Sequence, residues 1–114
     1  MAAYIIFTED VHDPEALQAY AAKAVPSVLQ YGGVPRIASS ATEVVEGEWH
    51  GQQTVMIEFE SVEAAQAWYN SPEYQDVVGE RHAAATSNAA RMRRCRLMDR
   101  RARRASRHRR SASS

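Results

Sequence analysis

The chain has 114 residues, of which 45% are hydrophobic and 25% charged, which is the size and composition of one globular domain. Its formal net charge of zero hides two opposite regions. Residues 1–90 hold three basic and thirteen acidic side chains, whereas residues 91–114 hold eleven arginines and one aspartate. We therefore predict a domain over residues 1–90 and an arginine-rich, disordered tail over residues 91–114, because that tail offers little apolar surface to bury.

Several classes of protein are excluded by simple counts. No apolar run approaches the roughly 20 residues that a membrane-spanning helix needs, and the first residues lack the features of a signal peptide. We therefore expect a cytoplasmic protein without membrane contact. Cys95 is the only cysteine, so neither an internal disulfide nor a cysteine-built metal site can form. The four histidines never recur at helical spacing, and no glycine-rich nucleotide loop occurs, so we predict no metal and no cofactor.

The first third of the chain predicts a strand followed by a helix. Residues 3–8 are a short apolar run typical of a buried, central strand. A helix is expected from the segment 13–15, in which Asp is a good N-cap, Pro suits the first turn and Glu is an acid there. Pro26 should break or kink this helix, and the glycine pair 32–33 should end it. Its apolar face would hold Leu17, Tyr20, Ala21, Ala24 and Val28.

The middle of the chain predicts strands and a connection. Residues 34–38 and 43–46 suggest either one long interrupted strand or two short ones, with a bulge or bend at Ser39 and Ser40. Residues 53–59 alternate apolar and polar side chains, which indicates a half-buried strand. The glycine-flanked segment 47–51 would connect it to the preceding strand.

Two helical segments and a final strand are expected next. Ser61 is a suitable N-cap for a helix through Asn70, and a second helical segment should run over residues 72–85. The order β-α-β-β-α needs one more strand to complete a split βαβ, ferredoxin-like sheet. Residues 86–97 are the place for it, but arginines fall on both faces, so this last strand is predicted to be missing or badly specified.

A set of short sequences resembles a known family: Ala-Tyr-Ile-Ile-Phe at 3–7, Asp-Pro-Glu-Ala at 13–16, Tyr-Gly-Gly at 31–33, Thr-Glu-Val-Val-Glu-Gly at 42–47, Glu-Phe at 58–59, and Ala-Ala-Gln-Ala-Trp-Tyr-Asn-Ser-Pro-Glu-Tyr at 64–74. Over residues 1–87 the chain resembles the domain of unknown function 1330 family of the dimeric α/β-barrel superfamily. The resemblance implies an α+β, ferredoxin-like sandwich with an antiparallel sheet that packs face to face with a second subunit. It brings no established reaction.

A homodimer is also expected from the residues themselves, because helices on one face of a sheet leave an apolar face uncovered. By resemblance, a ligand would lie in a cleft between sheet and helices. Candidate ligand-binding residues are Tyr20, Glu58, Trp68, Tyr69, Tyr74, Arg81 and His82. A carboxylate such as Glu58 on an apolar strand would have a raised pKa and could act as a base. The alternatives are that Glu58 pairs with Arg81 or faces solvent, and that the aromatic residues fill the core.

Three functions follow as hypotheses. The first is binding of a small organic molecule in the cleft; an enzyme of this kind would, by resemblance, have a cofactor-free oxygenase- or isomerase-like activity. The second is a structural or binding module without catalysis. The third is non-specific nucleic-acid binding through the arginine-rich tail. Nucleic acid is not the expected partner, since no aromatic residue accompanies those arginines for base stacking. The abrupt change to Arg, Ala and Ser also suggests a shifted reading frame as a hypothesis for the tail.

Overall fold

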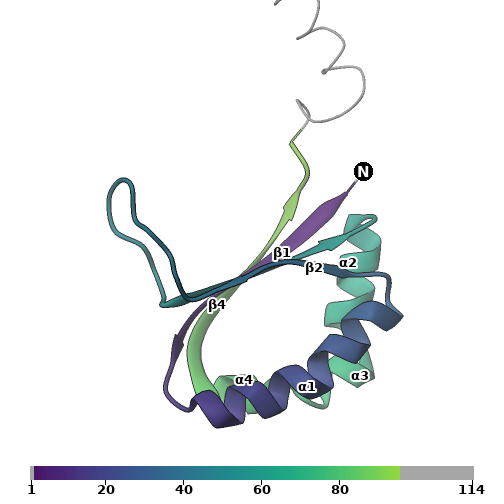
Figure 1. Cartoon of the computed structure of the whole chain (residues 1–114). Coiled ribbons are helices and arrows are strands. Elements are labelled where there is room, and N and C mark those ends of the chain that lie inside the picture. The colour runs from purple at the N-terminus through teal and green to yellow at the C-terminus, as the bar shows by residue number, and fades with distance from the viewer. Residues whose placement is uncertain (1, 96–114) are drawn as a thin grey trace, which may run out of the picture.

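Residues 2–95, which the computed structural model describes, form a four-stranded antiparallel sheet with helices on one face (Figure 1). The strand order β2-β3-β1-β4 is that of a split βαβ fold, so the predicted α+β, ferredoxin-like architecture is confirmed. β1 lies inside the sheet, as predicted. The strands are β1 (Ala3–Val11), β2 (Val34–Ser39), β3 (Gln53–Phe59) and β4 (Ala85–Arg93), and the helices are α1 (Pro14–Gln30), α2 (Val62–Tyr69), α3 (Pro72–Gln75) and α4 (Val78–Ala84).

Helix α1 begins where its capping residues predict and ends at Gln30, just before the glycine pair expected to end it. The Asp13 side chain accepts a hydrogen bond from the backbone N–H of Ala16 at 3.1 Å, which caps the first turn. The expected break at Pro26 is wrong, because α1 continues to Gln30. Pro26 and Ala22, the residue one turn earlier, both lie on the exposed side, where water can hydrate the carbonyl that proline leaves without a donor.

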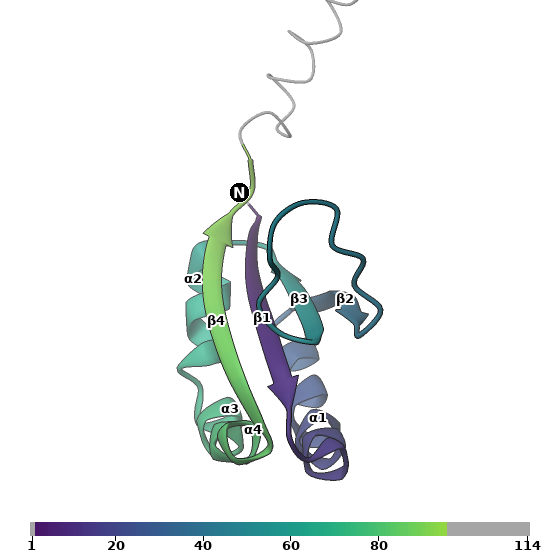
Figure 2. The same cartoon turned by 90° about the vertical axis from the view of Figure 1, so that its left-hand side faces the viewer.

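The connection between β2 and β3 is a long loop and not a strand. The strand expected over residues 43–46 is wrong, and the irregularity in β2 is a register shift between Pro35 and Ile37. The loop stands away from the sheet on the face opposite the helices, as Figures 1 and 2 show. Its Val45 side chain is 91% exposed, so no buried surface stabilises an extended conformation there.

This loop returns to the sheet through a close backbone contact. Gly51 has a positive φ of 103°, and a Cβ atom built on it would lie 2.7 Å from the backbone nitrogen of Glu9. The next residue, Gln52, donates its N–H to the Glu9 carbonyl at 2.8 Å. Glycine is required at position 51 because both the backbone conformation and the space exclude a side chain.

The helical segments after β3 follow their caps closely. The Ser61 side chain accepts from the Ala64 N–H, and α2 ends at Tyr69, as predicted to within one residue. The single helix expected over residues 72–85 is instead two short helices, α3 and α4, separated at Asp76 and Val77.

The prediction that the last strand is missing or badly specified is wrong. β4 pairs with β1 over nine residues, from Ala85 opposite Val11 to Arg93 opposite Ala3. It is an edge strand, and only Ala85 in it is fully buried, so exposed arginines on it cost little. β4 therefore extends past residue 90, the predicted end of the domain, while residues 96–114 of the predicted tail lie outside the described residues.

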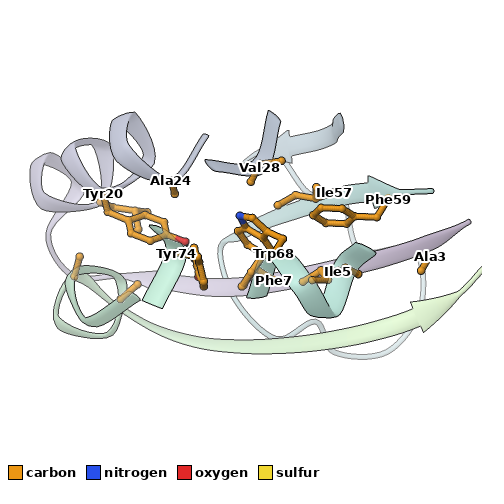
Figure 3. Packing of buried hydrophobic residues seen from close by; sticks show 14 residues of the cluster. Ala3, Ile5, Phe7, Tyr20, Ala24, Val28, Ile57, Phe59, Trp68 and Tyr74 are labelled. Atoms are coloured by element: carbon orange, nitrogen blue, oxygen red, sulfur yellow. Dashed lines mark hydrogen bonds between the residues drawn. The ribbon is translucent and has the colours of Figure 1, made fainter. Parts of the chain in front are cut away.

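The core lies between the sheet and the helices and is centred on one indole ring (Figure 3). Trp68 of α2 lies with its ring centroid 4.1 Å from that of Tyr74 and 5.6 Å from that of Phe59. Its Nε1–H donates to the Ser27 hydroxyl of α1 at 3.0 Å, so the buried polar atom has a partner. Within residues 2–95, no helix is both long and apolar enough to cross a membrane.

Candidate functional site

A cavity of about 170 Å³ lies between α1 and the helix-facing side of the sheet. Its walls are mostly apolar and come from both layers: Phe7, Leu17, Ala21, Ala24, Val25, Val28, Pro35, Ala38, Val55, Ile57 and Trp68. Four polar side chains complete the lining, namely Glu9, Tyr20, Gln53 and Arg81. An apolar space with a few polar groups is the usual form of a small-molecule site.

Glu9 is a buried acid on the central strand. Side chains alternate along β1, so Glu9 shares the helix-facing side with Ile5 and Phe7 and is only 3% exposed. Its Oε2 atom has no hydrogen-bond partner. Burial raises the pKa of the Glu9 carboxyl above its usual value, and the positive charge of Arg81 opposes this rise. Glu9 is therefore a carboxyl group with unused hydrogen-bonding capacity at the edge of an apolar space.

Arg81 of α4 supplies the opposite charge and is also 3% exposed. Its Nη1 donates to the Ser87 hydroxyl at 2.6 Å, and its Nη2 lies 3.4 Å from Nε2 of His82. The guanidinium carbon lies 4.8 Å from the centre of the Phe7 ring, a cation–π contact that helps to hold it in place. The Nε atom is buried without a partner. Glu9 and Arg81 thus each keep one unpaired polar atom.

Two tyrosines form a hydrogen-bonded pair next to these charges. The hydroxyl oxygens of Tyr20 and Tyr74 lie 2.8 Å apart in the core. Burial raises the pKa of both phenols, that of Tyr20 strongly, so each stays neutral at physiological pH. Tyr20 lines the cavity, whereas Tyr74 lies behind it, fully buried against Trp68.

The seven residues expected at the site divide into two groups. Tyr20, Trp68 and Arg81 line the cavity. Tyr74 is core, and Tyr69 packs against it and borders a separate shallow hollow beside β4. His82 is exposed at the end of α4 and reaches only the outer side of Arg81.

Glu58, the seventh, does not line the cavity. It lies on the opposite face of the sheet, because the period of two that buries Ile57 and Phe59 turns Glu58 away from the helices. Its Oε2 pairs with Nη2 of Arg36 at 3.1 Å. Hydrogen bonds from Arg36 and Tyr4 lower the pKa of Glu58, so both the expected raised pKa and the alternative pairing with Arg81 are wrong.

The sequence did contain a signal for Glu9. Ile5, Phe7 and Glu9 recur at a period of two, which predicts that all three face the same side of a strand. The strand expected over residues 3–8 is three residues shorter than β1 and does not reach Glu9. Within the described residues, no group of three or more His, Cys, Asp or Glu side chains could hold a metal ion.

Comparison with solved structures shows the same fold in proteins of low identity. A protein of unknown function from Rhodopseudomonas palustris is 20% identical with a TM-score of 0.67, over 83% of each chain. SnoaB, a cofactor-independent oxygenase from Streptomyces nogalater, is 14% identical with a TM-score of 0.60, over 86% of this chain and 98% of that one. A dimeric ferredoxin-like protein of unknown function from Thermobifida fusca is 10% identical with a TM-score of 0.51, over 81% and 90%.

Among curated proteins, no sequence matches. The family model described as "Domain of unknown function (DUF1330)" matches residues 2–94, which is nearly the whole part of the chain that the structure describes. Together with the four-stranded sheet and its helical layer, this match shows that the chain belongs to the DUF1330 family.

Proposed function

We propose that this protein binds a small organic molecule in the cavity between α1 and the sheet. The observation that carries the proposal is an apolar space of about 170 Å³ whose lining includes two buried charged residues, Glu9 and Arg81. Engineered apolar cavities of about 150 Å³ bind benzene, so this space suits a molecule of about one ring.

The two buried charged residues in this otherwise apolar lining favour a ligand over an empty space. A buried polar group without a partner costs about 1–3 kcal/mol, and more when it is charged. A ligand with a polar group beside Glu9 and Arg81 would reduce this cost.

The similar structures agree with this proposal without extending it. An oxygenase activity is stated for SnoaB alone, at 14% identity. For this chain we propose binding, and the alternative of a module without catalysis is compatible with the same cavity. Non-specific nucleic-acid binding stays a prediction, because residues 96–114 lie outside the described part of the chain.

We also propose that the protein is a homodimer in which the open faces of two sheets pack together. That face carries the exposed apolar residues Val34, Ile37 and Met92 and the half-buried Ile6 and Met56. A contiguous apolar area of this kind is typical of an interaction surface. The Thermobifida fusca protein with this fold is described as dimeric, which supports a second copy as the partner.

Filling the cavity tests the binding proposal. Toluene is titrated into the isotope-labelled full chain, and we expect the indole N–H signal of Trp68 to shift, because this ring lines the cavity. In Ala24→Phe the added ring occupies the cavity from α1, and the shift should disappear. The control Ala22→Phe places the same ring on the exposed side of α1 and should behave like the parent.

Circular dichroism checks that each variant is folded. Ala21→Phe, at a half-buried cavity position, replaces Ala24→Phe if the latter unfolds. An unchanged Trp68 signal at saturating toluene in the parent would contradict the proposal, as would an undiminished shift in the filled variants.

A further inference from the structure

We infer that the loop between β2 and β3, residues 40–52, is an arm that lies against the arginine-bearing end of β4 in a second copy of this chain. This inference rests on the homodimer proposed above, since it says which part of each subunit contacts which part of the other. Three observations support it: the direction in which the arm stands, its exposed apolar side chains, and the charges at two corners of the sheet.

The arm stands on the face of the sheet that we propose as the dimer interface. It leaves the sheet after Ser39 and returns to it through Gly51, on the side opposite the helices (Figures 1 and 2). A segment of this length that goes out and comes back can reach up to about 20 Å, whereas two sheets packed face to face lie about 10 Å apart. The arm can therefore run alongside the second subunit and past the plane of its sheet.

The arm exposes apolar side chains that bury little surface within one subunit. Val45 is 91% exposed, and Val44 and Trp49 are about half exposed. The Nε1–H of Trp49 donates to the Thr54 hydroxyl at 3.3 Å, and its ring stacks on His50 at 5.1 Å between centroids. A half-exposed indole that is already held in place loses little freedom on contact with a partner, and tryptophan is enriched at protein interfaces. The arm thus extends the apolar surface that the open sheet face offers to a second copy.

The arm and the end of β4 carry opposite charges. The arm contains no lysine or arginine and three exposed acids, Glu43, Glu46 and Glu48. β4 ends at Arg93, and Arg94 follows it; we call this pair the arginine corner. Neither the arm acids nor the arginine corner takes part in the ion pairs formed within residues 2–95. Such complementary surfaces attract each other and fix the orientation in which two subunits meet.

These two regions lie at diagonally opposite corners of the sheet. The arm returns beside the end of β1, where Gln52 bonds to Glu9, on the β3 side. Arg93 lies opposite Ala3 at the start of β1, on the β4 edge. A two-fold axis along the other diagonal would place each arm against the arginine corner of its partner, and this contact would occur twice. An arrangement with arm against arm would bring like charges together, so the charges favour the first.

Charge reversal in the arm tests the inference on the full chain. The arm variant carries three substitutions: Glu43→Lys, Glu46→Lys and Glu48→Lys. We expect its dimer to dissociate about tenfold or more readily than that of the parent at low salt, because attraction becomes repulsion at two symmetric contacts. The difference should shrink at high salt, which screens exposed charges. Sedimentation over a range of protein concentrations provides the dissociation constants.

The matched control reverses three exposed acids on the side of the helices: Glu15→Lys, Glu63→Lys and Asp76→Lys. It changes the net charge by the same amount as the arm variant and should dimerise like the parent. An equal loss of dimer in the control would overturn the inference, because net charge alone would then explain the effect.

Mixing two variants shows whether the contact is made between subunits. The corner variant, Arg93→Glu with Arg94→Glu, should dimerise as weakly as the arm variant. In a mixed dimer each arm meets a corner of opposite charge, so this dimer should form in preference to either homodimer. Native mass spectrometry measures the three species. If circular dichroism shows that the corner variant is unfolded, Arg93→Glu alone, at an exposed position, takes its place.

The outcomes separate this inference from the proposed dimer. Unchanged dimerisation of the arm variant, with a dimeric parent, would overturn the inference and leave the dimer standing; contact of arm with arm would give this result, because both charges would reverse together. A lack of preference for the mixed dimer would overturn it as well. A parent that is monomeric at micromolar concentration would refute the dimer and the inference together.

Discussion

β1 and β4 lie side by side and pair with each other over nine residues, but they differ in how many side chains they bury. β1 buries most of its side chains, including Ile5 and Phe7, between the helices and its neighbours. β4 fully buries only Ala85 and ends in exposed arginines. β4 is a strand because β1 offers a row of backbone hydrogen-bonding groups, and not because of its own side chains. Strand formation at an edge is therefore a property of the neighbour.

The largest expected effect comes from replacing one side chain on each strand by alanine. Phe7→Ala removes a buried ring that contacts Trp68 and Arg81, so we expect the free energy of unfolding to fall by about 3–5 kcal/mol. Arg91→Ala on β4, opposite Ile5, should change it by no more than about 0.5 kcal/mol. Urea denaturation at one fixed protein concentration measures both. Equal losses would show that β4 contributes side-chain packing that its exposure does not indicate.

The second test uses the other face of β1. Ile6 lies next to Phe7 in sequence but faces the open side of the sheet, where we propose the second subunit. Ile6→Glu would bury a carboxylate in that interface, so we expect the dimer to dissociate at least about 100-fold more readily. Sedimentation measures the mass, and Ala22→Glu on the exposed side of α1 is the matched control. A monomeric parent at micromolar concentration would refute the dimer.

The smallest expected effect concerns Glu9, the one acid that β1 buries, which lies opposite Ser87 of β4 in the strand pair. Because burial raises the pKa of Glu9 in the folded state, folding favours its protonated form, and this contribution to stability is lost as pH rises from about 4.5 through the folded pKa. Glu9→Gln lacks this loss, so its stability relative to the parent should increase between pH 4 and pH 7. The other ionisable groups near Glu9 are Arg81 and Tyr20.

The matched variant for this pH series is Glu58→Gln, for which we expect the opposite sign. The pKa of Glu58 is lowered in the folded state, so the parent gains stability as pH rises and the variant does not. Thermal or urea unfolding of the three proteins across this range provides the measurement. Parallel pH profiles for Glu9→Gln and the parent would contradict a raised pKa of Glu9.

The fold could be predicted where local signals decide it. Asp13 and Ser61 specify the starts of α1 and α2, and alternation specifies β3, because caps and periodicity act within a few residues. β4 could not be predicted in this way, since its stability comes from pairing with residues about 80 positions earlier. The Ser71 cap marks the start of α3 at Pro72 but contains no information on the break between α3 and α4, so that break could not be predicted from it.

The candidate site could also be predicted only in part. The family resemblance suggests Tyr20, Trp68 and Arg81 as residues of a cleft between sheet and helices, and the three line one cavity. The carboxylate chemistry of Glu58 suggests a site residue, but its position in the alternating pattern assigns it to the other face. Glu9 was missed because an acid at the end of an apolar run normally marks the end of a strand.

The contact between Gly51 and the backbone of Glu9 restricts which sequence changes the long loop can accept. The apex around Val45 is exposed and touches little, so insertions and substitutions there leave the sheet unaltered. At Gly51, a single added methyl group would meet the backbone of the strand that carries the buried acid. The return of the loop to the sheet must therefore be inherited unchanged for the cavity to keep its shape.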